Sequence, residues 1–170
     1  MRKIIINIVG NICSGKTTLI ESLKDDFYNT NFFSIDEYRI KYGSFDAISD
    51  QLVIEQLLKD VQSSPFSIVE SSGVGKLFNQ LKKIPQTEIY TFMLDCGSDI
   101  CLDRYKKRPK KYLQINERFE IEESLNYIER RLLSINPDYI INGIQLPEMI
   151  YREFHKIASR NESICKLLNR

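Results

Sequence analysis

The stretch from residue 3 to residue 23 joins an apolar strand, a glycine-bounded loop and a helix, and it constrains the fold more than any other part of the chain. Residues 4–9 read IIINIV, a mostly β-branched run that is typical of a strand buried on both faces. The loop 10–17 follows as GNICSGKT, and apolar side chains then recur at helical spacing at Leu19, Ile20 and Leu23. This loop fits the pattern G-x-x-x-x-G-K-[ST], which binds phosphate groups between a strand and a helix.

The residue types in this loop explain why it would bind phosphate. Glycines at positions 10 and 15 let the backbone curl so that successive N–H groups point into one anion-binding concavity. The helix that follows adds the positive end of its dipole. Lys16 can reach the β- and γ-phosphates, and the hydroxyl of Thr17 can ligate Mg²⁺. The alternative is a glycine turn that matches by chance, but the strand before the loop and the helix after it favour nucleotide binding.

Length and composition describe a single globular domain over residues 1–170. A chain of this length can bury one sizeable core, and its 42% hydrophobic and 28% charged residues are ordinary values. The net charge of +1 requires neither a nucleic acid nor a membrane as partner. No apolar run approaches the roughly 20 residues of a membrane-spanning helix, and no signal-peptide cleavage site follows the first apolar run. We therefore expect a cytoplasmic protein without a membrane partner, and its oligomeric state has no signature in the sequence.

Strand and helix patterns alternate along the rest of the chain. The first helix is expected to end near Asp26, and further strands are expected at 31–35, 66–73, 88–94 and 138–143. Further helices are expected at 44–62, 74–83, 98–108, 117–135, 146–158 and 161–168. This alternation predicts an α/β fold, with a five-stranded parallel sheet and helices on both faces. Because ligands bind at the carboxyl ends of such strands, one edge of the sheet should gather the loop 10–17, the segment 36–39, Glu70 and Asp95.

Together these features resemble the P-loop kinase group, which includes nucleoside monophosphate kinases, gluconate kinases and polynucleotide kinases. The element order supports the resemblance over most of the chain, and the sharper motifs lie at residues 10–17, 36–39 and 104–108. The resemblance implies a three-layer P-loop NTPase fold with the strand order 2-3-1-4-5. It also implies ATP as donor and Mg²⁺ as cofactor, with donor contacts from Gly10, Asn11, Ile12, Cys13, Ser14, Gly15, Lys16, Thr17, Thr18, Arg104 and Asn142.

The segment 36–39, which reads DEYR, is similar to the D-x-Y-R stretch of polynucleotide-kinase-like phosphotransferases. In that family the aspartate is the general base for an acceptor hydroxyl, and the arginine holds an acceptor phosphate. The resemblance therefore assigns Asp36 as a catalytic base and Arg39 as a substrate-binding residue. A hydroxyl nucleophile must lose a proton, whereas a phosphate nucleophile is already ionised, so Asp36 favours a hydroxyl acceptor. Arg39 favours an acceptor with negative charge. The alternative is a solvated turn at the end of a strand.

Two carboxylates compete to serve the metal together with Thr17. Asp95 follows the apolar residues 92–94, as the aspartate of a Walker B strand does, whereas Glu70 follows the third strand. In the strand order that the resemblance implies, the third strand lies beside the loop-bearing strand, on the side of the acceptor. We therefore expect Glu70 to lie near the metal and the substrate, and Asp95 to be a helix-capping or strand-end residue.

A basic run at residues 104–111 has six lysines and arginines in eight positions. Arg104 and Arg108 share a helix face, and the run resembles the lid of small P-loop kinases, whose arginines stabilise the charge on the transferred phosphoryl group. We expect this lid at about 104–116. The alternatives are a solvated basic face and a patch that binds a polyanion. After the fifth strand, Asn142 lies where the family contacts adenine, and Gly143 is equally well explained by a turn with positive φ.

These features lead to an expected ATP-dependent phosphotransferase that acts on a small, nucleotide-like, anionic acceptor with a hydroxyl nucleophile. The expected catalytic residues are Lys16, Asp36, Arg104 and Arg108. The alternatives are a nucleoside monophosphate kinase, a 5′-hydroxyl polynucleotide kinase that would bind a nucleic acid end, and an ATP sensor that transfers no phosphate. A switch-type GTPase is disfavoured because the guanine-reading string N-K-x-D is absent.

Overall fold

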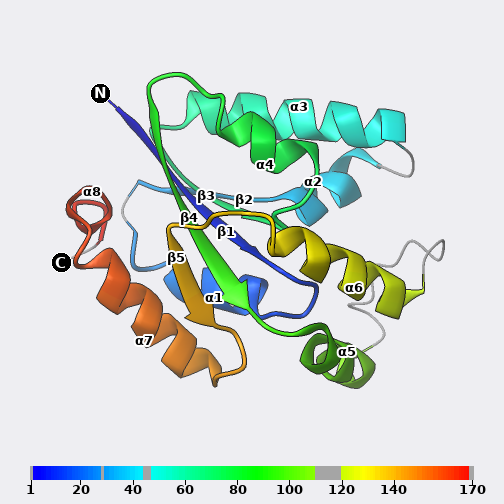
Figure 1. Cartoon of the computed structure of the whole chain (residues 1–170). Helices are drawn as coiled ribbons and strands as arrows, with labels where there is room; N and C mark the ends of the chain where they lie inside the picture. Colours follow the sequence, from blue (N-terminus) through cyan, green and yellow to red (C-terminus); the bar gives the residue numbers. More distant parts are fainter. Residues whose placement is uncertain (1, 28, 44–46, 110–119, 169–170) are drawn as a thin grey trace.

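A single parallel sheet organises the computed structural model, which describes residues 2–27, 29–43, 47–109 and 120–168. Its five strands lie in the order β2-β3-β1-β4-β5, which confirms the expected arrangement (Figure 1). All neighbouring strands are parallel. The strands are β1 Lys3–Gly10, β2 Asn31–Ser34, β3 Phe66–Ser71, β4 Thr87–Asp95 and β5 Tyr139–Asn142.

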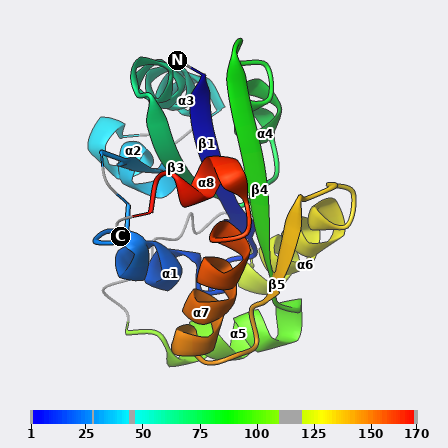
Figure 2. The same ribbon diagram turned by 90° about the vertical axis from the view of Figure 1, so that its left-hand side faces the viewer.

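Helices cover both faces of this sheet (Figures 1 and 2). In the described residues they are α1 Lys16–Leu23, α2 Ile35–Tyr42, α3 Ala47–Ser63, α4 Lys76–Leu81, α5 Ser98–Lys107, α6 Ile121–Leu132, α7 Pro147–Ala158 and α8 Glu162–Cys165. Helices α1, α7 and α8 pack on one face, and α3, α4 and α6 pack on the opposite face. The three layers confirm the α/β fold expected from the alternation of strand and helix patterns.

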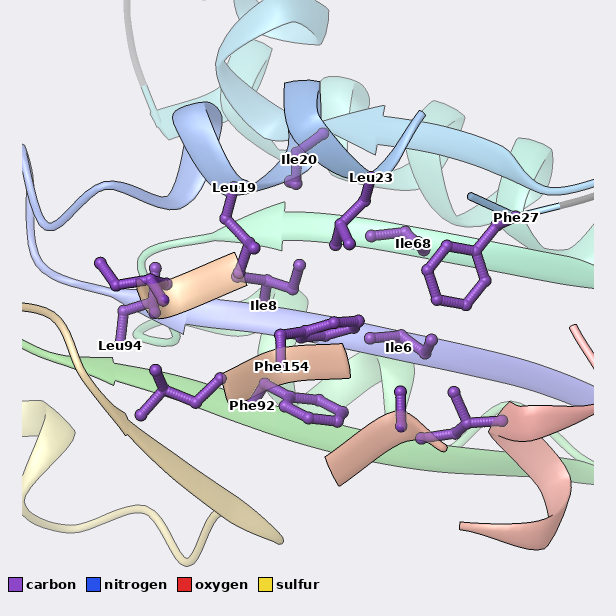
Figure 3. Packing of buried hydrophobic residues seen from close by; sticks show 14 of the residues in the cluster. Ile6, Ile8, Leu19, Ile20, Leu23, Phe27, Ile68, Phe92, Leu94 and Phe154 are labelled. Carbon is purple, nitrogen blue, oxygen red and sulfur yellow. The ribbon is translucent and has the colours of Figure 1, made fainter. Parts of the chain in front are cut away.

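The apolar run of β1 is continuous because this central strand is buried on both faces. Ile6 and Ile8 join the cluster formed with α1 and α7, whereas Ile5 joins the cluster formed with α3 and α4. Figure 3 shows the first cluster, in which the tilted rings of Phe92 and Phe154 pack together with their centroids 4.6 Å apart. The alternation of side chains along the strand thus supplies apolar atoms to both layers.

The register brings the carboxyl ends of the strands to a common edge. Gly10 of β1 lies opposite Leu94 of β4, Ser34 of β2 lies opposite Glu70 of β3, and Asp95 of β4 lies opposite Asn142 of β5. The loop 10–17 and the segment 36–39 both begin at this edge. The predicted gathering of these segments therefore follows from the parallel pairing.

Several element bounds differ from the expectation. Helix α1 ends at Leu23, three residues before the expected end at Asp26, where the chain turns through the hydrogen bond from the Asp26 N–H to the Leu23 carbonyl. The expected strand 31–35 ends at Ser34, and helix α2, which was not predicted, begins at Ile35. The last helix is only Glu162–Cys165. Parts of the expected helices 44–62 and 117–135, residues 44–46 and 117–119, lie outside the described residues.

No helix in the described part of the chain is both long enough and apolar enough to cross a membrane.

Candidate functional site

Two glycines shape the loop between β1 and α1. At Gly10 a Cβ atom would lie 2.7 Å from the Ser14 Oγ and 2.8 Å from the Leu94 carbonyl oxygen, so a side chain has no room there. Gly15 has a φ of 102°, a conformation that favours glycine. Cys13 also has a positive φ, of 60°. The backbone therefore curls where the sequence pattern predicts, immediately before α1.

Asn11 anchors the loop to α6 from inside the protein. Its side chain is only 1% exposed, its Nδ2 donates to the Leu125 carbonyl at 3.0 Å, and its Oδ1 accepts from the Ile12 N–H at 2.9 Å. The Lys16 Nζ donates to the Asn11 carbonyl at 2.7 Å. Because both the amide nitrogen and the amide oxygen of Asn11 bond to protein groups, its contribution to a nucleotide site is the placement of the loop and of Lys16.

A carboxylate from β3 reaches the start of α1. The Thr17 Oγ1 donates a hydrogen bond to the Glu70 Oε1 at 2.8 Å, and Glu70 is buried. Burial raises the pKa of Glu70; Lys16 and the Thr17 hydrogen bond oppose this shift, and the charges of Asp36 and Glu37 add to it. Burial lowers the pKa of Lys16, against the opposing charges of Glu70 and Asp36. Residues from the loop, β3 and α2 therefore share one electrostatic environment.

The hydroxyl of Thr17 and the carboxylate of Glu70 are the oxygen ligands that suit Mg²⁺. This ion is usually held by one or two protein oxygens together with substrate phosphates and water. The described residues contain no group of three or more His, Cys, Asp or Glu side chains that could hold a metal by themselves. The pair beside Lys16 fits Mg²⁺ that arrives with a nucleotide, because the phosphates complete such a coordination shell.

Asp95, the other candidate metal carboxylate, lies at the end of β4 with an exposed side chain. Its backbone carbonyl accepts from the Gly143 N–H at 2.7 Å. Strands β3 and β4 flank β1 on opposite sides, so the two carboxylates lie on opposite sides of the loop-bearing strand. It is Glu70 that contacts Thr17.

Asp36 and Arg39 both lie on α2, with Asp36 in its first turn. The Arg39 Nη1 donates to the Asp36 Oδ1 at 3.1 Å. A second carboxylate, Asp50 of α3, accepts from the Arg39 Nε at 2.7 Å and from Nη2 at 3.3 Å. Although burial lowers the pKa of Arg39, the hydrogen bonds and charges of Asp50 and Asp36 raise it above its ordinary value, so the guanidinium stays charged. The sequence did not identify Asp50, and it carries no motif that would have done so.

The two predicted arginines of the basic run approach the loop from α5. The Arg104 Nη1 donates to the carbonyls of Cys13 and Ser14, both at 3.4 Å, and its Nη2 donates to the Ile144 carbonyl at 3.4 Å. Arg108, which follows α5, has its Nη1 3.9 Å from the Cys13 Sγ. Both cations therefore lie beside the loop. The rest of the predicted lid, residues 110–116, lies outside the described residues.

A pocket of about 310 Å³ opens beside the loop, between Arg104 and the start of α7. Its lining residues come from the loop, α1, α5, the connection before α7 and the first turn of α7: Cys13, Gly15, Thr18, Leu19, Arg104, Ile144, Gln145, Leu146, Pro147 and Ile150. Sequence reasoning did not assign Leu19 or the last five to a site, because apolar and amide side chains in a helix or a connection have no distinguishing pattern.

The turn after β5 differs from the expectation for Gly143. Gly143 is not among the glycines with positive φ, so the alternative explanation, a turn that needs positive φ, does not hold. Its Cβ would instead lie 3.0 Å from the Asp95 carbonyl oxygen and 3.1 Å from the Cys96 Cβ, and a close approach of β4 explains the glycine. The Asn142 Oδ1 accepts from the Ile144 N–H at 2.9 Å and shapes the connection that lines the pocket.

Neither a protein-family model nor a curated protein sequence matches this chain. Solved structures do match its fold. A sugar kinase from a Janibacter species is 15% identical, with a TM-score of 0.65 over 96% of this chain and 98% of that one. Shikimate kinase from Aquifex aeolicus is 22% identical, with a TM-score of 0.59 over 89% and 94%.

A chain of the Pnkp1/Rnl/Hen1 RNA repair complex is 13% identical, with a TM-score of 0.64 over 79% of this chain and 47% of that one. The present chain therefore corresponds to about half of that protein. At these identities the comparisons show a shared fold, and the fold is that of the P-loop kinases.

Proposed function

We propose that this chain, which has the fold of the P-loop kinases, transfers the γ-phosphate of Mg-ATP to a hydroxyl of a small, nucleotide-like, anionic acceptor. The observation that carries the proposal is geometric: the Thr17 Oγ1 donates to the Glu70 Oε1 at 2.8 Å, and Glu70 lies opposite Ser34, the residue that precedes α2. Lys16 belongs to the loop that would bind the donor, and Asp36 lies on α2, so the proposed donor site and the proposed base would share one edge of the sheet.

The donor would bind along the loop 10–17, with its phosphates at the N-terminus of α1 and its base in the pocket beside Arg104. Backbone N–H groups and the Lys16 ammonium supply positive charge for the β- and γ-phosphates. Thr17 and Glu70 would hold the Mg²⁺, which neutralises charge on the phosphate oxygens when it is bound. Arg104 and Arg108, already beside the loop, would stabilise the charge that develops on the transferred group.

Asp36 would accept the proton of the acceptor hydroxyl, and Arg39 would bind the anionic group of the acceptor. The hydroxyl oxygen then forms a bond to the γ-phosphorus while the bond from that phosphorus to the bridging oxygen breaks, and ADP leaves with the electron pair. Arg39 has five N–H donors, and the contacts of the described residues use three of them. The remaining donors support its role toward an anion.

The similar structures support a kinase, because two of them are described as a sugar kinase and a shikimate kinase. Both names denote proteins that phosphorylate small molecules. The acceptor of this chain is proposed from Asp36 and Arg39 rather than from those names.

Label transfer from γ-labelled ATP tests the proposal across a panel of nucleosides, mononucleotides, oligonucleotides and sugar acids. We expect labelled product with a hydroxyl acceptor, no product with Lys16→Ala, and a loss of about 10²-fold or more with Asp36→Asn. Tight ATP binding without labelled product from any acceptor would show that the chain is a sensor instead. Substantial turnover by Asp36→Asn would favour a nucleoside monophosphate kinase.

A 5′-hydroxyl polynucleotide kinase is the second candidate. It is favoured by the exposed lysines at the end of α5, Lys106 and Lys107, next to Arg108. If a nucleic acid end is the acceptor, oligonucleotides should outcompete mononucleotides, and binding should weaken steeply with added salt because phosphate contacts release counterions. Salt-independent turnover of a mononucleotide would exclude this candidate.

A further inference from the structure

Asp50 accepts two hydrogen bonds from the Arg39 guanidinium. Both carboxylate oxygens are used, one with the Arg39 Nε at 2.7 Å and the other with Nη2 at 3.3 Å. A two-point contact of this kind fixes the plane of the guanidinium as well as its position. Asp50 is also the less exposed of the two aspartates, since its side chain is 30% exposed and that of Asp36 is 63% exposed.

Asp36 is held by the opposite end of the same guanidinium. Its Oδ1 accepts from the Arg39 Nη1 at 3.1 Å, and this is its one ion pair among the described residues. A side chain with so much exposure would otherwise sample several rotamers, and each orientation that misses the acceptor would cost turnover. The position of Asp36 therefore depends on Arg39, and the position of Arg39 depends on Asp50.

A second link between α2 and α3 separates this effect from simple packing. The Tyr38 hydroxyl donates to the Asp60 Oδ2 at 2.6 Å, so Asp60 also ties the two helices together. Asp60 has no contact with Arg39 among the described residues. Substitutions of Asp50 and Asp60 should thus both loosen the helix pair, but only the first should release Arg39.

We propose that Asp50 is a positioning residue, which fixes Arg39 and through it orients the Asp36 carboxylate toward the acceptor hydroxyl. The proposal rests on the proposed function because it takes Asp36 to be the acceptor base. Asp50 itself touches neither substrate nor metal. It keeps the guanidinium of Arg39 in one orientation. The Asp36 carboxylate and the remaining N–H groups of Arg39 then stay at fixed positions relative to the acceptor.

Crystal structures of Asp50→Asn and Asp60→Asn test the positioning without any acceptor. In Asp60→Asn we expect the contact between the Arg39 Nη1 and the Asp36 Oδ1 to remain at about 3 Å. In Asp50→Asn we expect that contact to be lost or the Asp36 side chain to occupy more than one rotamer. An unchanged contact in Asp50→Asn would overturn the proposal. Arg39→Lys keeps the charge but not the two-point contact with Asp50. If Asp50→Asn does not fold, we expect the Asp36 side chain of Arg39→Lys to occupy more than one rotamer, and a single rotamer would overturn the proposal.

Transfer assays with D-gluconate, shikimate and adenosine 3′-monophosphate as acceptor probes test the consequence. We expect Asp50→Asn to lower kcat about 10- to 100-fold with unchanged ATP affinity, whereas Asp60→Asn stays within about twofold of wild type. In an Arg39→Ala background, Asp50→Asn should cause no further loss, because both changes remove one linked interaction. Additive losses would overturn the positioning role. Full turnover by Asp36→Asn would instead overturn the proposed base, so the two failures are distinguishable.

Discussion

Gly143 and Gly97 follow β5 and β4, and neither has a positive φ, yet their surroundings differ. A Cβ at Gly143 would approach the Asp95 carbonyl oxygen to 3.0 Å, whereas at Gly97 the nearest atom, the Glu129 Oε1, would be 3.8 Å away. We predict that Gly143→Ala lowers the free energy of unfolding by about 1–3 kcal/mol, because backbone atoms must move. Gly97→Ala should change it by less than about 1 kcal/mol.

Urea denaturation of both glycine variants measures this difference directly. If Gly143→Ala is as stable as Gly97→Ala, the ends of β4 and β5 relax without cost. The close approach of β4 would then not explain why residue 143 is a glycine.

Glu70 should make the stability of the protein depend on pH. Burial, the largest cause, raises its pKa above the ordinary 4.5, so the folded state favours the protonated carboxyl. The protonated Glu70 therefore contributes stability that is fully present below pH 4.5 and is lost as the pH rises through the pKa that Glu70 has in the folded state. We predict that Glu70→Gln gains stability relative to wild type across that window and that the difference is constant above it. Unfolding from pH 4 to pH 8 in metal-free buffer measures it, and a pH-independent difference would contradict the prediction.

At the scale of elements, Phe154 is the largest of the three buried side chains of α7. This side chain is 0% exposed and packs against Phe92 and Phe27 (Figure 3). We predict that Phe154→Ala lowers the free energy of unfolding by about 3–5 kcal/mol, through lost contacts and a cavity, and lowers Tm by roughly 6–20 °C. Met149→Ala, at an exposed position of the same helix, should have an effect within about 0.5 kcal/mol. Calorimetry of both variants tests whether burial or helix composition decides the stability.

Helix α2 shows how local signals can be present and still be missed. Its apolar residues do not form a clear stripe, so hydrophobic spacing alone does not predict a helix at Ile35–Tyr42. Other signals were available, since Ser34 stands at the N-cap with two acidic residues in the first turn, and Gly43 follows at the C-terminal end with a φ of 67°. In the structure the helix is stabilised by packing and side-chain bonds to α3, which are long-range contacts.

For the whole molecule, donor binding and acceptor chemistry should be separable. The pocket is lined by residues of α5, α7, α1 and the loop 10–17, whereas Asp36, Arg39 and Asp50 lie on α2 and α3. We predict that Mg-ATP at about 100 times its Kd stabilises the protein by about 2.7 kcal/mol, which raises Tm by roughly 5–10 °C. Asp36→Asn should retain this shift and Lys16→Ala should lose it. Thermal denaturation with and without Mg-ATP gives the answer, and a lost shift in Asp36→Asn would show that the two regions are coupled.

The sequence by itself determined the fold class and the strand, loop and helix of residues 3–23. The strand, loop and helix of residues 3–23 are encoded by neighbouring residues, because burial of β1, the glycines and the helical spacing are all local patterns. The alternation of strands and helices likewise predicted a five-stranded parallel sheet, and the resemblance to P-loop kinases supplied its order.

Only the tertiary structure decided which distant side chains meet. The pairing of β3 with β1 puts Glu70 beside Thr17, although the residues before Asp95 look more like a metal-binding strand. The packing of α2 on α3 joins Arg39 to Asp50, which has no motif. The pocket beside Arg104 likewise forms from segments that are distant in the chain. These contacts depend on long-range packing, which leaves no periodic or local signal in the residues that take part.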